Sequence, residues 1–390
     1  MQQTPLSMRT HVAIFGQTNA GKSALFNALL GQNLAIVSNE SGTTTDPIIK
    51  AMELIGAGPI ALIDTAGLGD ASSLGTSRME KTKSILDRTD FALYAADAAD
   101  FDPAAYRQMT QAFEGKRIPH LLVFTKTDVA SAPDGYPDAV CVSIKDSESI
   151  EALKRVLTDR LSRIAQKEES MIGGLVEAGG TVVMVVPVDS EAPKGRLILP
   201  QVQLLRDCLD HGIKCLVTRE TELEDALREL AHIDLVVTDS QIFSVVDGIV
   251  PDSIPLTSFS MLMARMKGDL SVFLQGIEAI SKLQDGDRVL VAEACTHNTS
   301  HEDIGRVKIP RALQKKTGKS LVFTHDTGHD FPENLSEYRL VLHCGGCMLN
   351  QRAMQSRIDA CQSAGVPITN YGVVLAYTAG ILDRAKKIFE

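Results

Sequence analysis

A glycine-rich loop near the N-terminus has the residue types and spacing for binding phosphate. The stretch HVAIFGQTNAGKSALFNALLG contains Gly16, four further residues and then Gly21-Lys22-Ser23, between an apolar run and a segment of helical period. This is the pattern of a P-loop. Its glycines let backbone N–H groups approach phosphates, and the helix N-terminus that follows favours negative charge. We therefore expect a nucleotide to bind here.

The residues that end this loop have separate expected roles. Lys22 is expected to reach the β- and γ-phosphates and Ser23 to coordinate Mg²⁺, and Ala24 belongs to the same predicted nucleotide site. A glycine-rich turn that binds nothing is the alternative interpretation. The Gly-Lys-Ser ending and the strand-to-helix context make that alternative the weaker one.

Two later segments are predicted to complete the phosphate and magnesium site. The GTTTD stretch at residues 42–46 offers the Thr44 hydroxyl to Mg²⁺, in a segment expected to switch with the nucleotide. The DTAG stretch follows an apolar strand. We expect Asp64 to hold Mg²⁺ through water and the Gly67 N–H to contact the γ-phosphate.

The TKTD stretch indicates a guanine nucleotide rather than an adenine nucleotide. The Asp128 carboxylate can accept hydrogen bonds from the N1–H and the exocyclic amine of guanine. Adenine lacks this pair of donors, so a buried carboxylate left unpaired would reject it. Thr125 and Lys126 open the stretch, and Ser143 and Lys145 in VSIKD fall where a further base-contacting loop is expected.

Residues 8–165, which carry these motifs, resemble the translation-factor-like GTPases, in the branch of the tRNA-modification and Era-type enzymes. Thr125 stands where that family usually has the Asn of N-K-x-D, and Ile144 stands where it has the Ala of S-A-K. The lysine and aspartate of the first motif are kept. The resemblance implies hydrolysis of GTP to GDP and phosphate.

Two positions bear on how hydrolysis would proceed. Leu68 follows DTAG, where Ras-like enzymes place a glutamine that orients the attacking water. A leucine cannot do this, so slow hydrolysis is expected.

An asparagine at the position of Asn19 accompanies potassium activation in the resembling branch, and a K⁺ beside the phosphates would stabilise developing charge. The alternative for Asn19 is an ordinary polar loop residue. Lys22, Asn19 and Thr44 are thus the predicted catalytic residues.

A second group of chemically versatile residues lies near the C-terminus, in two segments that each follow an apolar run. EACTHNTSHED contains Cys295, His297, His301 and Glu302; RLVLHCGGCMLN contains His343, Cys344 and Cys347. Four interpretations compete: a dithiol redox pair, a structural Cys₃His zinc site, a [4Fe–4S] cluster held by three cysteines, and coincidence. By spacing, the zinc and iron–sulfur interpretations are about equal.

A GTPase joined to C-x-H and H-C-x-x-C resembles, over the full length of the chain, the HydF family of [FeFe]-hydrogenase maturation GTPases. The resemblance implies a scaffold that binds a [4Fe–4S] cluster, receives a di-iron precursor from two radical-SAM maturases and passes it to apo-[FeFe]-hydrogenase. It also implies a homodimer. The cluster ligands it implies are Cys295, Cys344 and Cys347. His297, Glu302 and His343 are then candidates for a fourth ligand or for contacts with the di-iron cargo.

Composition limits the classes of function. The chain has 390 residues, a formal net charge of −10 and 44% hydrophobic residues. The negative charge argues against a nucleic-acid partner, and no apolar run is long enough to span a membrane. No signal peptide is recognisable, so a cytoplasmic location is expected. The alternative function is a GTPase with a structural zinc domain that acts in RNA modification or ribosome assembly; the net charge weighs against it.

Short apolar runs alternate with segments of helical period along the chain. This alternation predicts an α/β protein with parallel or mixed sheets, which would position these residues. We expect three domains: a GTP-binding P-loop domain at residues 1–167, a dimerisation α/β domain at 168–258 and an iron–sulfur cluster-binding α/β domain at 259–390. One long helix is expected over SMLMARMKGDLSVFLQGIEAISKL, at the start of the third domain. The segments with Cys295 and Cys344 are expected to face each other, because ligands gather at strand ends in open sheets.

Overall fold

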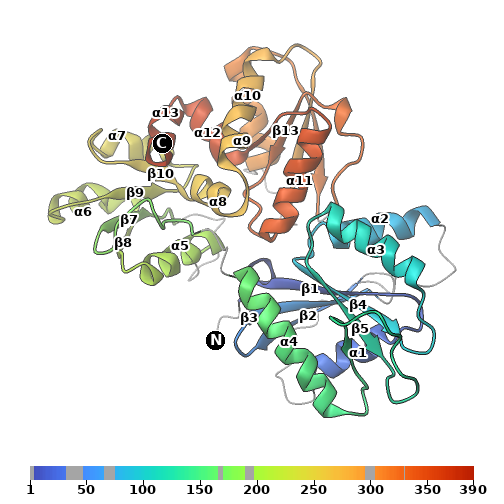
Figure 1. Ribbon diagram of the computed structural model, residues 1–390. Helices are drawn as coiled ribbons and strands as arrows, with labels where there is room; N and C mark the ends of the chain where they lie inside the picture. The colour runs from blue at the N-terminus through green and yellow to red at the C-terminus, as the bar shows by residue number, and fades with distance from the viewer. Residues whose placement is uncertain are drawn as a thin grey trace. The chain divides into compact units, whose positions relative to one another are not determined.

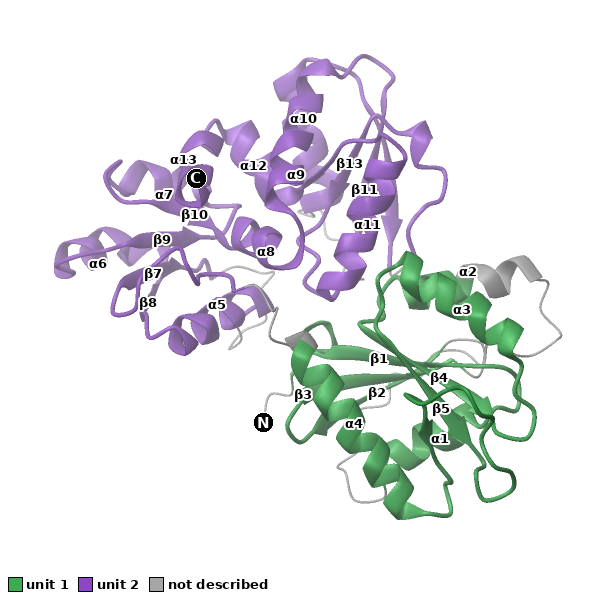
Figure 2. Cartoon of the chain, viewed as in Figure 1, with its two compact units in different colours: residues 1–168 green, residues 169–390 purple. Residues whose placement is uncertain are grey.

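The computed structural model describes residues 4–31, 47–65, 75–165, 170–188, 197–294, 304–328 and 330–390. The chain forms two compact units, Met1–Glu168 and Glu169–Glu390, coloured separately in Figure 2.

The first unit is built on a six-stranded mixed sheet with the strand order β2-β3-β1-β4-β5-β6. Strand β2 runs antiparallel to β3, and the other neighbours are parallel. The central strands are almost wholly apolar, as expected for strands covered on both faces. The strands are β1 (Thr10–Phe15), β2 (Ile48–Leu54), β3 (Gly58–Asp64), β4 (Phe91–Asp97), β5 (His120–Thr125) and β6 (Val140–Cys141).

Helices cover both faces of this sheet (Figure 1). One apolar layer joins the sheet to α1 and α4, and the other joins it to α2 and α3. Helix α3 begins where the Asp102 carboxylate accepts hydrogen bonds from two backbone N–H groups, with Pro103 in its first turn. The helices are α1 (Lys22–Leu30), α2 (Gly75–Leu86), α3 (Pro103–Gly115) and α4 (Ser147–Ala165).

The second unit contains two four-stranded sheets, each parallel throughout. The first has the order β10-β9-β7-β8. Its apolar layers join it to α5 and α8 on one face and to α6 and α7 on the other. Its elements are β7 (Thr181–Val185), α5 (Leu199–Asp210), β8 (Lys214–Thr218), α6 (Leu223–Glu229), β9 (Leu235–Thr238), α7 (Phe243–Ile249), β10 (Leu256–Ser258) and α8 (Phe259–Lys267).

The second sheet of this unit has the order β12-β11-β13-β14. Strands β11 and β13, which precede the two cysteine segments, are direct neighbours. One hydrophobic core continues from the first sheet into the second, so both belong to one compact unit. The elements are α9 (Leu270–Ile277), β11 (Arg288–Glu293), α10 (Ile309–Thr317), β12 (Val322–Thr327), β13 (Leu340–His343), α11 (Gln351–Ser363), β14 (Ile368–Asn370), α12 (Tyr371–Ala379) and α13 (Leu382–Lys386).

The predicted fold class is confirmed: an N-terminal α/β part with a mixed sheet is followed by two smaller α/β parts. The single long helix expected at the start of the third domain is wrong. The chain instead forms α8 and α9, because α8 ends at Gly268 and the Asp269 side chain caps a new helix by accepting from Val272 N. Among the described helices, none combines the length and the apolar character that crossing a membrane requires.

Candidate functional site

The P-loop joins the end of β1 to the start of α1, as its sequence predicts. Gly16 has φ of 143°, and a Cβ there would lie 2.1 Å from Ala95 O, so no other residue fits without moving β4. Lys22 is 7% exposed, and its ammonium donates to Gly16 O at 2.9 Å and Gln17 O at 2.6 Å. These contacts hold the lysine across the loop, where a phosphate chain would lie.

The predicted magnesium residues that the structure describes lie beside this loop. Asp64 ends β3 and pairs with Ile14 of β1, and it is 4% exposed. The next residue, Thr65, donates from its hydroxyl to Ile14 O at 2.6 Å and so fixes the end of β3 against β1. Ser23 is exposed in the first turn of α1, which Ala24 continues. Two oxygen groups suited to Mg²⁺ thus flank the loop.

The TKTD motif is tied directly to the P-loop. The Lys126 ammonium donates to Asn19 O at 2.8 Å and to the Asp97 carboxylate at 2.7 Å. This ion pair, with a bond from Ala99 N–H, holds the pKa of Asp97 below its usual value. The Thr125 hydroxyl donates to Ala20 O at 2.8 Å. Thr125 therefore supports the loop through its side chain, although the related family usually has an asparagine there.

The guanine-recognition residues form a connected set. The Lys145 ammonium and the Ser143 hydroxyl donate to the two oxygens of Asp128, at 2.7 and 2.8 Å. These two bonds, Lys145 foremost, hold the pKa of the Asp128 carboxyl below its usual value. The carboxylate is thus kept ionised and oriented, the form that accepts two hydrogen bonds from guanine.

Some predicted nucleotide residues remain untested. Thr44 and Gly67 lie outside the described residues. Asn19 is exposed and has φ of 64°, a left-handed conformation that asparagine tolerates better than most residues. Its role in potassium activation stays a prediction.

The second candidate site is the cysteine turn, residues 343–349, which begins as β13 ends. Cys344 is 7% exposed, and its backbone N–H donates to Ala292 O of β11 at 2.9 Å. Its sulfur accepts from Ala294 N at 3.2 Å and from Gly346 N at 3.4 Å. Gly346 has φ of 62°, which a side chain would strain. Ala294 immediately precedes Cys295 in the sequence, so the chain enters the segment with the third cysteine beside the Cys344 sulfur.

His343 points both ring nitrogens at protein partners. Its Nδ1 donates to Cys344 O at 2.7 Å, and its Nε2 accepts from Arg357 Nη1 at 2.9 Å, since a guanidinium can only donate. The ring is fully buried. Arg357 also donates to Gly328 O at 2.8 Å. In this arrangement His343 orients the cysteine turn, and binding a metal through either nitrogen would require breaking one of these bonds.

Lys267, at the end of α8, holds the other side of the cysteine turn. Its ammonium donates to Leu349 O at 2.9 Å, Cys347 O at 3.1 Å and Gly346 O at 3.4 Å. The residue is 4% exposed. Burial lowers the pKa of Lys267 to about 8, although the nearby Cys347 and Cys344 thiols act in the opposite direction. A buried cation is thus placed beside two of the predicted cluster ligands.

Comparison with known families decides what kind of protein this is. The hydrogen maturase F dimerization domain model matches residues 171–268, and the hydrogen maturase F tetramerization domain model matches residues 271–388. Together they span more than half of the chain. The chain belongs to the hydrogen maturase F family. Both descriptions name assembly of subunits, which supports oligomerization of this family member.

The N-terminal part of this hydrogen maturase F chain is a GTPase domain. The 50S ribosome-binding GTPase model matches residues 11–126. The tRNA modification GTPase MnmE of Ralstonia nicotianae is 34% identical over an alignment of 162 positions, and the match covers 38% of this chain and 34% of that protein. The MnmE of Bordetella parapertussis is 34% identical over 149 residues, 38% of this chain and 33% of that protein. The chain therefore spans about a third of the length of these relatives.

Solved GTPase structures resemble this chain only weakly, in both sequence identity and TM-score. The G domain of the T. maritima FeoB iron transporter is 24% identical, with a TM-score of 0.30, over 39% of this chain and 99% of that one. Aquifex aeolicus Era bound to GDP and aluminium fluoride is 16% identical, with a TM-score of 0.25, over 84% of this chain and 97% of that one. These scores are too low to bear on the fold.

The remaining predicted metal residues of the hydrogen maturase F chain are untested. Cys295, His297 and Glu302 lie outside the described residues. Within the described residues, no three His, Cys, Asp or Glu side chains are grouped closely enough to hold a metal ion. Cys344 and Cys347 remain the described members of the predicted ligand set.

Sequence reasoning missed Lys267 and Arg357, which hold the cysteine turn from two different helices. Each is an isolated basic residue in a helical segment, and such a residue normally lies at the surface. A signal for Lys267 was available. It is preceded in the same helix by Met261 and Met263, which are 0% and 1% exposed, so the apolar residues before it indicate a packed helix.

Proposed function

We propose that this hydrogen maturase F protein is a GTP-hydrolysing scaffold that binds a [4Fe–4S] cluster and delivers a di-iron precursor to apo-[FeFe]-hydrogenase. The precursor would come from two radical-SAM maturases. The observation that carries the proposal is the pairing of β11 and β13, which brings Ala294 N–H to the Cys344 sulfur one residue before Cys295. GTP binding, Mg²⁺ and a GTPase domain are its established part.

The residues of the cysteine turn fit an iron–sulfur cluster. Backbone N–H groups directed at a cysteine sulfur stabilise thiolate and tune the potential of a cluster. Cys344 accepts two such bonds, and Cys347 follows after two glycines. The buried Lys267 ammonium supplies positive charge beside both. An anionic group held by thiolates suits these surroundings better than two neutral thiols do.

Three thiolates suit the role of a carrier. Cys295, Cys344 and Cys347 would bind three irons of a cluster and leave the fourth iron for a more labile ligand. When bound, the cluster supplies an iron site that can accept and release cargo. His297 and Glu302 are the proposed fourth ligand or cargo contacts. For His343 we propose orientation of the cysteine turn, since both of its ring nitrogens are engaged.

Anaerobic reconstitution with iron and sulfide tests the cluster. Wild-type protein should bind about four irons with the absorption and EPR of a [4Fe–4S] centre. Cys295→Ala, Cys344→Ala and Cys347→Ala should each lose it. Cys361→Ala is the matched control, because that thiol is buried in α11 of the same unit. Wild-type protein that binds stoichiometric zinc and no iron would refute the proposal and favour the structural zinc alternative.

For the nucleotide site we propose slow hydrolysis that potassium stimulates. Lys22 would stabilise charge on the β- and γ-phosphates, while Ser23, Thr44 and Asp64 hold Mg²⁺ directly or through water. K⁺ near Asn19 would take the place of an arginine finger. Steady-state rates in KCl and NaCl of equal ionic strength test this, with Asn19→Ala for comparison. Equal rates in the two salts would remove the potassium part and leave the GTPase assignment standing.

Delivery of the precursor is tested by activating apo-[FeFe]-hydrogenase in a defined mixture with the two maturases. Hydrogenase activity should require this protein and should be lost with Cys344→Ala.

We further propose that the bound nucleotide sets the timing of partner exchange and does not drive transfer of the precursor. Equal affinity of the GTP and GDP forms for every partner would contradict that timing. Light scattering should find a homodimer or a higher oligomer, consistent with the two family models.

A further inference from the structure

Lys267 is a buried cation whose hydrogen bonds all go to uncharged groups. Its three N–H donors face three backbone carbonyls, those of Gly346, Cys347 and Leu349. In the part of the chain that the structure describes, no carboxylate forms an ion pair with it. The ionisable side chains that act on its pKa are the thiols of Cys347 and Cys344, which carry negative charge only when deprotonated. A buried ammonium costs several kcal/mol unless an anion is nearby, so this position calls for negative charge.

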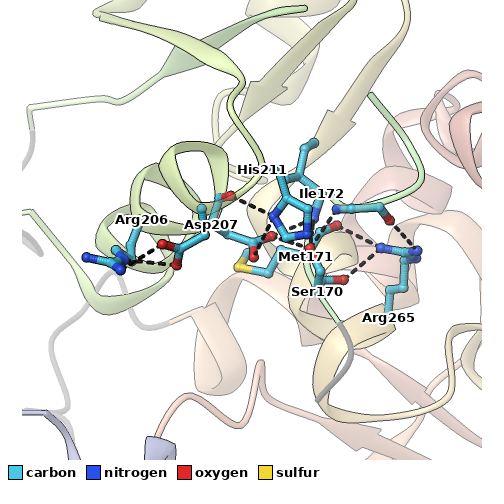
Figure 3. A network of polar contacts seen from close by, with 9 residues as sticks. Ser170, Met171, Ile172, Arg206, Asp207, His211 and Arg265 are labelled. Carbon is cyan, nitrogen blue, oxygen red and sulfur yellow. Dashed lines mark hydrogen bonds and ion pairs between the residues drawn. The ribbon is translucent and has the colours of Figure 1, made fainter. Parts of the chain in front are cut away.

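Arg265 of the same helix provides an internal comparison. It donates to Ser170 O at 2.7 Å, Gly173 O at 2.9 Å and Met171 O at 3.1 Å, and so holds another turn through three backbone carbonyls (Figure 3). It is only half-buried, however, and its turn carries no thiol. Helix α8 therefore holds two turns with two cations, and one of the cations is buried beside cysteines.

We propose that Lys267 is a positioning residue for the iron–sulfur cluster, fixing the turn that carries Cys344 and Cys347 and offsetting the negative charge of the bound cluster. The inference rests on the proposed cluster-binding function. A cluster held by thiolates becomes more negative when it accepts an electron. A fixed positive charge next to it stabilises that reduced form most, and so raises the reduction potential.

A purely structural lysine would behave differently. It would hold the carbonyls of the turn, and its loss would lower the stability of the second unit without changing the potential of a cluster that still binds. The reduction potential therefore separates the two roles. The reaction measured is the one-electron reduction of [4Fe–4S]²⁺ to [4Fe–4S]⁺, with dithionite as the electron donor.

The test is an EPR-monitored redox titration of the full chain after anaerobic reconstitution. In Lys267→Met, the ratio of reduced to oxidised cluster at a fixed potential should fall at least tenfold, a shift of about 59 mV to more negative potential. Lys267→Arg keeps the charge and should stay close to wild type. Arg265→Met removes a cation and three carbonyl bonds from the same helix, and should leave the potential unchanged. A wild-type potential in Lys267→Met overturns the proposal.

Lys267→Gln guards against a methionine variant that fails to fold. Glutamine keeps an N–H donor for the turn and removes the charge, so its potential should also shift negative, and a wild-type value would overturn the proposal. The rate of iron release to a chelator should rise in both uncharged variants and not in Lys267→Arg. Wild-type protein without an iron–sulfur cluster would instead refute the proposed function itself, before any variant is compared.

Discussion

The nucleotide site and the cysteine turn are held in place in different ways. In the nucleotide site, recognised motifs contact one another: Lys126 reaches the P-loop at Asn19, and Lys145 reaches Asp128. The cysteine turn also has bonds of its own, such as that from His343 to Cys344 O, but the side chains of Lys267 in α8 and Arg357 in α11 hold it from outside the motif. A site whose members support each other is largely visible in sequence. A site supported by ordinary residues elsewhere in the chain is visible only after folding.

This difference predicts that the nucleotide site depends most on its own motif residues. Lys22→Met should reduce the GTP hydrolysis rate about 10²–10³-fold, the effect of removing one group that stabilises transition-state charge. Steady-state phosphate release measures it. Lys154→Met is the matched control, since that half-buried lysine forms an ion pair with the exposed Glu151 within α4, and a pair with an exposed partner contributes little. A Lys22→Met enzyme as fast as the control would show that hydrolysis does not depend on this motif lysine.

Guanine selectivity should depend on Asp128 nearly as strongly. Asp128→Ala removes an ionised acceptor of two hydrogen bonds and should weaken GDP binding about 100-fold, roughly 3 kcal/mol. Calorimetric titration with GDP and ADP measures the change. The exposed Asp134 supplies the control Asp134→Asn, which should bind GDP like wild type. Unchanged preference for GDP over ADP in Asp128→Ala would show that other residues select the base.

The cysteine turn should respond to a residue outside its motif. Arg357→Met leaves the buried Nε2 of His343 without its donor, at a cost of about 1–3 kcal/mol to the free energy of unfolding. Denaturant unfolding of the apo protein, followed by circular dichroism, measures this. Arg311→Met in α10 removes an exposed arginine and should cost much less. If the two variants unfold alike, the turn does not depend on Arg357.

The smallest effect is expected where a motif departs from its family. Thr125→Asn restores the usual residue, but the Thr125 hydroxyl already donates to Ala20 O. The GDP dissociation constant should therefore change by less than about threefold, roughly 0.6 kcal/mol, less than one typical hydrogen bond. A tenfold gain in affinity for GDP would mean that the Thr125 hydroxyl supports the loop poorly. The nucleotide site would then depend on the asparagine that the family usually has at this position.

Most strands could be predicted because they are short apolar runs between turn residues. Strands β7, β8 and β11 are runs of this kind. Strands β10 and β14 could not be predicted in this way, since each has three residues and is specified by its neighbours in the sheet rather than by its own pattern. Helices α8 and α9 were merged because their apolar positions run on across Gly268, and only the Asp269 cap marks the break.

The sequence by itself determined the P-loop, the guanine motif, the α/β architecture and the candidate cysteines, because local spacing fixes which backbone groups and side chains converge. Tertiary structure decided what surrounds the cysteine turn. Lys267 lies 79 residues before Gly346, and a lysine in a helix normally points to water. Its ammonium is buried here because α8 packs beside the end of β13, where the carbonyls of the turn and two thiols provide partners that no local pattern encodes.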